Sequence, residues 1–306
     1  MSLPDLFSGF ETRSMPVGDV AIHCRVGGLA GAAPLVLLHG YPQTHAMWHR
    51  LAGPLAERFR VVVPDLRGYG GSSVPEDRPG HAAYTKRAMA EDIVRLMADL
   101  GHDRFSLVGH DRGARVGYRL ALDHPGRLDR LALLDIVPTA EMWSGMDARL
   151  ALKVYHWLFL AQPAPMPEQL IGGAPIPYLE HTLASWTKAK NLSAFDPAAL
   201  DHYRASYADP RRRHATCEDY RAGAGPDRTH DEADRAAGRL IGVPTLVLWG
   251  AAGIPAGDPD VETGSPLATW RRWCRQVEGQ PIDAGHFLPE ENPAATLAAL
   301  LPFLSR

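Results

Sequence analysis

Short apolar runs occur along the chain, and stretches with helical spacing separate them. Five runs are almost wholly apolar rather than alternating, which is typical of strands buried on both faces of a parallel sheet. They span Leu35 to Leu38, Val61 to Val63, Phe105 to Val108, Leu131 to Leu134 and Thr245 to Leu248. An earlier run, Val20 to Val26, is expected to form an antiparallel strand. This pattern predicts an α/β fold with a mostly parallel central sheet and helices on both faces.

The clearest helical pattern runs from Thr85 to Leu100. Its apolar residues recur at helical spacing on one face, and Gly101 is expected to end the helix; they are Met89, Ile93, Leu96, Met97 and Leu100.

The alternation of strands and helices stops between about Pro138 and Arg239, where no strand-like run occurs. The simplest organisation is an α/β core of residues 1–137 and 240–306, with residues 138–239 inserted as a helical cap. Within that insertion, Arg211 to Arg213 are expected to lie on a solvated face.

Composition narrows the class of protein. The 306 residues include 32 Lys and Arg against 35 Asp and Glu, a formal net charge of −3, which argues against nucleic acid as the main partner. Apolar residues make up 45% and charged residues 22%, ordinary values for a globular chain. No apolar run approaches the roughly 20 residues that a membrane helix needs, and MSLPDLFSGF has no signal-peptide features, so a cytoplasmic protein without membrane contact is expected.

Cysteine and histidine spacing predicts no metal site. Cys24, Cys217 and Cys274 have no metal-ligand spacing and are expected to be reduced thiols. The 14 histidines include no pair with zinc-site spacing.

The turn Gly109-His110-Asp111-Arg112-Gly113 follows a buried run and precedes a helical segment that reaches His124. This is the form of a nucleophile elbow, with Asp111 in the place of the nucleophile. A carboxylate there can displace a leaving group from a saturated carbon and form an ester with the enzyme, so the substrate class is halides or epoxides. Because a helix N-terminus and two arginines are nearby, the pKa of Asp111 is expected to be lowered. The alternative is that Asp111 only caps a helix.

Hydrolysis of such an ester needs a general base and an acid that orients it. His286 follows the nucleophile in the expected chain order and is the candidate base, with His156 as its rival. The stretch Trp249 to Gly253 holds no acid where one is usual, so Asp135 is the preferred orienting acid over Asp258 and Asp260.

Backbone N–H groups of Tyr41, in His39-Gly40-Tyr41-Pro42, and of Arg112 are expected to form an oxyanion hole. Arg112 and Arg115 are three residues apart at a helix start, so both lie near Asp111 and could grip a substrate carboxylate. This favours a small halo acid. The alternative is that both arginines pair with surface or cap acids.

A departing halide needs hydrogen-bond donors, and the cap offers His156, Trp157 and Tyr220. On spacing alone, aromatics that simply pack the cap are the favoured interpretation of these residues.

The chain resembles the fluoroacetate dehalogenases of the α/β-hydrolase superfamily. The stretches that carry the resemblance are HGYPQTHAMWHR from His39, DLRGYG from Asp65, GHDRGARVGYRLALD from Gly109, LLDIVPT from Leu133, YHWLFLAQPAP from Tyr155, CEDYRAGA from Cys217 and GHFLPEE from Gly285. GHDRGAR together with YHW is the most specific, whereas epoxide hydrolases share HGYP.

The resemblance implies a homodimeric enzyme without a cofactor that converts fluoroacetate to glycolate and fluoride. It implies Asp111 as nucleophile, His286 as base and Asp135 as its partner. It places Arg112 and Arg115 on the substrate carboxylate, and it assigns the halide to three residues of the cap, namely His156, Trp157 and Tyr220. Two departures stand out: the family has Phe where this chain has Tyr41, and the stretch Gly253 to Ser265 is longer than usual.

Two other functions remain open. An epoxide hydrolase would use the same nucleophile with cap tyrosines such as Tyr203, Tyr207 or Tyr220, but it leaves the two arginines unexplained. A hydrolase-fold protein that binds a small carboxylate without turnover would explain the missing acid after Leu248, but it leaves Asp111, His286 and Asp135 without a role.

Overall fold

The computed structural model describes residues 3–255 and 265–306. In these residues eight strands form one sheet in the order β1-β2-β4-β3-β5-β6-β7-β8. The strand β2 is antiparallel to both neighbours, whereas β4, β3, β5, β6, β7 and β8 are parallel to one another. The bounds are β1 Glu11–Val17, β2 Val20–Gly28, β3 Pro34–Leu38, β4 Arg60–Pro64, β5 Phe105–His110, β6 Leu128–Leu134, β7 Thr245–Gly250 and β8 Val277–Ile282.

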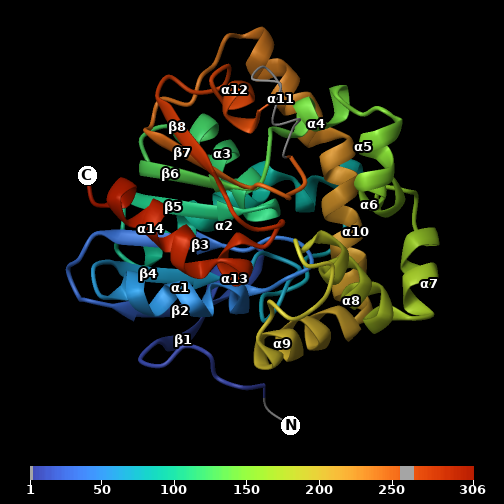
Figure 1. Cartoon of the computed structure of the whole chain (residues 1–306), viewed down its shortest axis with the longest axis horizontal. Coiled ribbons are helices and arrows are strands. Elements are labelled where there is room, and N and C mark those ends of the chain that lie inside the picture. The colour runs from blue at the N-terminus through green and yellow to red at the C-terminus, as the bar shows by residue number, and fades with distance from the viewer. Residues whose placement is uncertain (1–2, 256–264) are drawn as a thin grey trace.

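Helices cover both faces of this sheet. The helices α1 and α14 pack together on one face, and α2 and α3 pack together on the other (Figure 1). The bounds in and beside the sheet layer are η1 His45–Trp48, α1 His49–Ala56, η2 Pro79–Tyr84, α2 Lys86–Asp99, α3 Arg112–Asp123, α12 Pro266–Trp270, α13 Leu288–Glu291 and α14 Pro293–Leu304.

The six strands expected from sequence are all present, and β2 is antiparallel as predicted. The strands β1 and β8 were not predicted, because they are the two edges of the sheet and their sequences carry little apolar signal. Most positions of β1 are exposed or half-buried, and β8 contains Gly279 and Pro281, which are uncommon inside strands.

The helix predicted from Thr85 is α2. The Thr85 side chain accepts a hydrogen bond from the Ala88 N–H at 3.2 Å, which caps the first turn. Gly101 follows the helix with φ +85°, a conformation that glycine adopts at little cost.

Between β6 and β7 the described chain is helical and contains no strand. Figure 1 shows α5 to α10 gathered at one side of the sheet. The bounds are α4 Thr139–Ser144, α5 Ala148–Lys153, α6 Tyr155–Leu160, α7 Met166–Gly172, α8 Pro175–Trp186, α9 Pro197–Ala208, α10 Pro210–Ala224 and α11 Pro226–Ala236. The predicted solvated face at Arg211 to Arg213 was wrong for Arg213, which is buried and donates to the backbone carbonyls of Tyr207 and Ala208.

Buried ion pairs tie this helical segment to α3. Arg119 on α3 donates to Asp231 at 2.9 Å and to Asp234 at 2.5 Å, both on α11. Such pairs need good geometry to offset the loss of hydration, so they fix where the helical segment sits over α3.

Among the described residues, no helix is both long enough and apolar enough to cross a membrane.

Candidate active site

Asp111 lies at the junction of β5 and α3 in a backbone conformation that is rare for a residue with a side chain, φ +47° and ψ −115°. The turn is tight enough that a side-chain carbon on Gly109 would lie 2.6 Å from the Cα of Ala114. A side-chain carbon on Gly113 would collide with the His39 carbonyl oxygen. The two glycines of the elbow are therefore required by close packing, and they let Asp111 protrude from the end of the strand.

The Asp111 carboxylate is buried and held by a backbone donor. Its Oδ1 accepts the Tyr41 N–H at 2.9 Å, and its side chain is close to that of His286. Burial alone would raise the pKa of Asp111, but the charges of His286 and His110, and then of Arg112 and Arg115, outweigh it, so the pKa is lowered. The lowered pKa agrees with the predicted direction, although His286 lowers it more than either arginine does.

His286 and Asp135 meet directly. The His286 Nδ1 lies 2.5 Å from Asp135 Oδ2, and its Nε2 faces Asp111 Oδ2 at 3.9 Å with no hydrogen-bond partner. Burial lowers the pKa of His286, but the hydrogen bond to Asp135 and the charges of Asp135 and Asp111 raise it further, so the net shift is upward. The structure thus brings together the three residues predicted as nucleophile, base and orienting acid.

The loop after β7 explains why the orienting acid follows β6. Asp135 has φ +55°, and its carboxylate accepts the N–H groups of Gly250 at 2.8 Å and Ile254 at 3.2 Å. Any side chain on Gly253 would collide with the Asp135 carboxylate. The loop therefore cradles an acid that comes from the neighbouring strand. The alternative acids Asp258 and Asp260 lie outside the described residues.

Arg112 is largely occupied by an acid of α10. Its Nε donates to Asp219 Oδ2 at 3.0 Å and its Nη2 to Asp219 Oδ1 at 2.5 Å. Lys86 Nζ and Tyr69 Oη also contact Asp219. Burial would raise the pKa of Asp219, but Arg112 and Lys86 hold it well below its usual range. The alternative of pairing with a cap acid thus applies to Arg112, although its Nη1 is buried without a partner.

Arg115 has no acid partner among the described residues. Its Nη1 donates to the Val137 carbonyl and to the Thr139 hydroxyl, both at 3.0 Å, and its Nε is buried without a partner. Burial lowers the pKa of Arg115, yet a guanidinium stays charged in proteins. A buried cation beside Asp111 therefore lacks a full counter-charge.

Of the three residues predicted near the halide, Trp157 and Tyr220 pack against these arginines, and His156 packs against Tyr220. The Trp157 ring is 4.6 Å from the Arg115 guanidinium carbon, and the Tyr220 ring is 4.3 Å from that of Arg112. His156 and Tyr220 have ring centroids 5.6 Å apart. The His156 Nδ1 and the Tyr220 hydroxyl are buried and have no hydrogen-bond partner in the described part of the chain.

His156 differs from His286 in its protonation. Burial lowers the pKa of His156 to about 3, so its imidazole is neutral near neutral pH. No described acid forms a hydrogen bond with His156, whereas Asp135 orients His286. The geometry therefore favours His286 over His156 as a base.

Tyr41 makes one hydrogen bond through its backbone and one through its side chain. Its N–H bonds Asp111, while its hydroxyl lies 3.1 Å from that of Tyr207. Arg112 is the first residue of α3, so its N–H has no acceptor within the helix. The Tyr41 hydroxyl thus has a hydrogen-bond partner.

Sequence reasoning missed two residues of this site. Asp219 lies in the stretch CEDYRAGA without a motif of its own, and only the fold shows that it holds Arg112. Trp186 at the end of α8 has ring centroids 4.3 Å from His156 and 5.4 Å from His286, and no local signal marks it.

Asp219→Asn is expected to lower the free energy of unfolding by about 3–5 kcal/mol, because it leaves Arg112 and Lys86 as buried cations without their shared anion. Denaturant unfolding measures the change. The control is Asp283→Asn, which removes an exposed partner of Lys188 and should cost less than about 1 kcal/mol. Equal effects of the two substitutions would contradict this account of Asp219.

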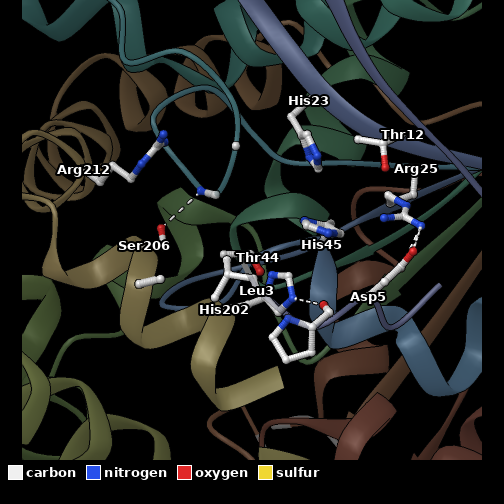
Figure 2. A pocket seen from close by; sticks show the side chains of 14 residues that line it. Leu3, Asp5, Thr12, His23, Arg25, Thr44, His45, His202, Ser206 and Arg212 are labelled. Carbon is white, nitrogen blue, oxygen red and sulfur yellow. Dashed lines mark hydrogen bonds and ion pairs between the residues drawn. The ribbon is translucent and has the colours of Figure 1, made fainter. Parts of the chain in front are cut away.

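Among the described residues, two groups of His, Asp and Glu side chains are close enough to be considered for a metal: His23, His45 and Asp65, and Asp77, His214 and Glu218. The first adjoins a cavity of about 370 Å³ that Figure 2 shows between β2, η1 and α9. Asp65 already accepts hydrogen bonds from His45 Nδ1 at 3.0 Å, His23 Nδ1 at 3.1 Å and the Gly71 N–H at 2.7 Å. Hydrogen bonds therefore account for this cluster, and none of the predicted site residues lines its cavity.

Comparison with known proteins places this geometry in a family. Residues 33–293 match the family described as alpha/beta hydrolase fold. The chain is 44% identical to a fluoroacetate dehalogenase from Burkholderia sp over 98% of its own length and 95% of that protein. It is 29% identical to a soluble epoxide hydrolase from Corynebacterium sp. over 89% of this chain and 90% of that one.

A crystal structure of a putative alpha/beta hydrolase from Nostoc sp PCC 7120 has a TM-score of 0.92 and 49% identity, covering 98% of this chain and 99% of that chain. The sheet order and the elbow at Asp111 indicate the same fold as these matches. The chain belongs to the alpha/beta hydrolase fold family.

Proposed function

We propose that this protein is a haloacetate dehalogenase that hydrolyses fluoroacetate to glycolate and fluoride through an ester on Asp111. The observation that carries the proposal is the buried guanidinium of Arg115, which lies beside an ionised Asp111 and has no described acid partner. A substrate carboxylate supplies the missing anion, and the partnerless Nε of Arg115 and Nη1 of Arg112 are donors for it. The similarity to a fluoroacetate dehalogenase supports the same substrate class.

In the first step, Asp111 Oδ2 attacks the carbon that bears the halogen, and the carbon–halogen bond breaks as the new C–O bond forms. Asp111 Oδ1 stays on the Tyr41 N–H, which fixes the direction of attack. The leaving fluoride takes the bonding electron pair. His156, Trp157 and Tyr220 are the donors that would stabilise it, because N–H and O–H groups aimed at a developing anion lower the barrier.

In the second step, His286 removes a proton from water, and the hydroxide attacks the carbonyl carbon of the ester. Asp135 holds His286 in the orientation needed and stabilises its charged form. The oxyanion of the tetrahedral intermediate lies at the N–H groups of Tyr41 and Arg112. Its collapse releases glycolate and returns Asp111 with one oxygen from water, so the reaction consumes one water and yields one proton.

The helical segment 138–239 would act as a cap over the core of residues 1–137 and 240–306. Its role in this proposal is to supply the halide donors and Asp219, and to exclude water from the carboxylate of Asp111. The homodimer and the cytoplasmic location stay predictions.

An epoxide hydrolase is the second candidate, which the similarity to epoxide hydrolases favours. It would need two acidic hydroxyls at the site. Of the three tyrosines named for that role, Tyr203 donates its hydroxyl to Glu290 at 2.9 Å and Tyr207 is paired with Tyr41, so only Tyr220 among them has a buried hydroxyl without a partner in the described residues. The Tyr178 hydroxyl is also buried without such a partner, and its ring stacks on that of Tyr207, with centroids 6.2 Å apart. A neutral epoxide would also leave the charge of Arg115 uncompensated. For a protein that only binds a carboxylate, the contact of His286 with Asp135 and its approach to Asp111 would have no use.

Fluoride release from fluoroacetate, measured beside diol formation from a small epoxide, tests the assignment. We expect fluoride and no diol. Diol without fluoride would favour the epoxide hydrolase, and neither product, with fluoroacetate bound, would favour the binding protein. Parallel assays with chloroacetate and bromoacetate would show which halo acid is preferred.

The pH dependence of kcat follows from the raised pKa of His286. Only the neutral imidazole can accept a proton from water, so activity should fall tenfold per pH unit on the acid side. In the free enzyme this titration lies above the ordinary value of 6.5, because Asp135 and Asp111 favour the charged form. Esterification removes the charge of Asp111, so the acid limb of kcat should lie below the His286 titration of the free enzyme. NMR titration measures the pKa of His286 in the free enzyme, and a pH–rate profile measures the pKa of the acid limb of kcat. A kcat limb that lies above the free-enzyme pKa would contradict the proposed role of Asp111 in raising it.

A further inference from the structure

A cavity of about 290 Å³ lies between α5 and α6, the end of α8 and the loop after β7. Lys153, His181, Trp186, Lys190, Gly253 and Ile254 are among the residues that line it, and no acidic residue of the described parts of the chain does.

The inner wall of this cavity is the outer side of the candidate active site. Trp186 lines the cavity and also contacts His156 and His286. Ile254 lines it and donates its N–H to Asp135 at 3.2 Å. One indole ring and one loop therefore separate the cavity from the groups proposed to carry the chemistry.

The rim of the cavity is cationic. Lys153 Nζ donates to the Gly253 carbonyl at 2.8 Å, and Lys190 Nζ donates to the Ser185 carbonyl at 2.8 Å. Each ammonium carries three donors, so both have N–H groups to spare. Neither lysine forms an ion pair with an acid in residues 3–255 and 265–306. Burial lowers the pKa of Lys153, the charge of Asp135 raises it, and the charges of Lys190 and Arg149 lower it, so two further cations lie near Lys153.

We propose that this cavity is an access vestibule that selects anions: Lys153 and Lys190 attract the carboxylate of the substrate and deliver it past Trp186 to Asp111. The proposal rests on the proposed function, because a neutral substrate would gain nothing from the two charges. A charged mouth raises the local concentration of an oppositely charged ligand, and dissolved salt screens this effect over about 10 Å. The vestibule should therefore act on the capture of substrate and leave the chemical steps at Asp111 unchanged.

The test compares kcat and kcat/KM for fluoroacetate at low and high ionic strength in three proteins. The Lys153→Met/Lys190→Met variant should lose about tenfold in kcat/KM at low salt, with kcat within about twofold of the wild type. Its kcat/KM should also depend less on salt. Lys188→Met is the matched control, since it removes a neighbouring charge that pairs with Asp283 outside the cavity, and it should keep the wild-type salt dependence.

Two further variants keep the result interpretable. Lys153→Arg/Lys190→Arg retains both charges and should restore the salt dependence. Lys190→Met alone leaves the contact of Lys153 with Gly253 in place and should show part of the loss even if the double variant is unstable. A double variant with the wild-type kcat/KM and salt dependence would overturn the vestibule. Absence of fluoride release from the wild type would instead overturn the proposed function.

Discussion

Asp111→Asn is expected to reduce fluoride release from fluoroacetate by a factor of about 10⁴ or more, as loss of a catalytic nucleophile does in other hydrolases. An amide oxygen is a far weaker nucleophile than a carboxylate, and it cannot form the ester that the second step consumes. The substitution is nearly isosteric and can still accept the Tyr41 N–H, so the fold should be retained. An ion-selective electrode measures the loss of fluoride release, and a thermal unfolding curve shows whether the fold is retained.

Isotope labelling tests whether Asp111 is the nucleophile or only positions other groups. A single turnover in ¹⁸O water should place the heavy oxygen in the Asp111 carboxylate, because water attacks the ester carbonyl. Label found directly in the glycolate would mean that water attacks the substrate carbon and that no ester forms. An Asp111→Asn protein that binds fluoroacetate as the wild type does, together with a wild type that releases no halide, would identify a binding protein.

His286→Asn is expected to stop turnover after the first step and to trap the ester. Steady-state fluoride release should fall by about 10³ to 10⁴, but each active site should still release one fluoride. The reason is that Asp111 attacks without a base, whereas the ester is hydrolysed only when His286 activates water. Mass spectrometry of the intact protein and of its peptides should find a carboxymethyl group on Asp111.

His156→Asn is the comparison that tests the choice of base. His156 is the neutral donor proposed for the halide, so its loss should slow the first step and no ester should accumulate. If the ester instead accumulated in His156→Asn and was absent from His286→Asn, the roles of the two histidines would be exchanged.

The interior of the sheet and the elbow could be predicted from sequence, because their signals are local. An apolar run such as Phe105 to Val108 marks a buried strand wherever its neighbours lie, and the two glycines around Asp111 are required by the turn itself. The edge strands β1 and β8 could not be predicted in this way, because they form by pairing with β2 and β7 rather than by a pattern of their own.

The choice of Asp135 as the orienting acid came from the sequence by elimination, since the stretch after Leu248 has no acid. The structure adds the physical reason, which is that the backbone of Gly250 and Ile254 binds the Asp135 carboxylate and Gly253 leaves room for it.

The sequence by itself determined the α/β architecture, the strand-to-helix turn at residue 111 and the residue types able to carry out nucleophilic displacement and hydrolysis. Only the tertiary structure decided how the charges are shared: Arg112 is paired with Asp219, which is 107 residues away in the chain, while Arg115 has no described acid partner. The reason is that turn geometry and strand burial depend on near neighbours in sequence. The partner of a buried charge depends on which distant segments the fold packs against it.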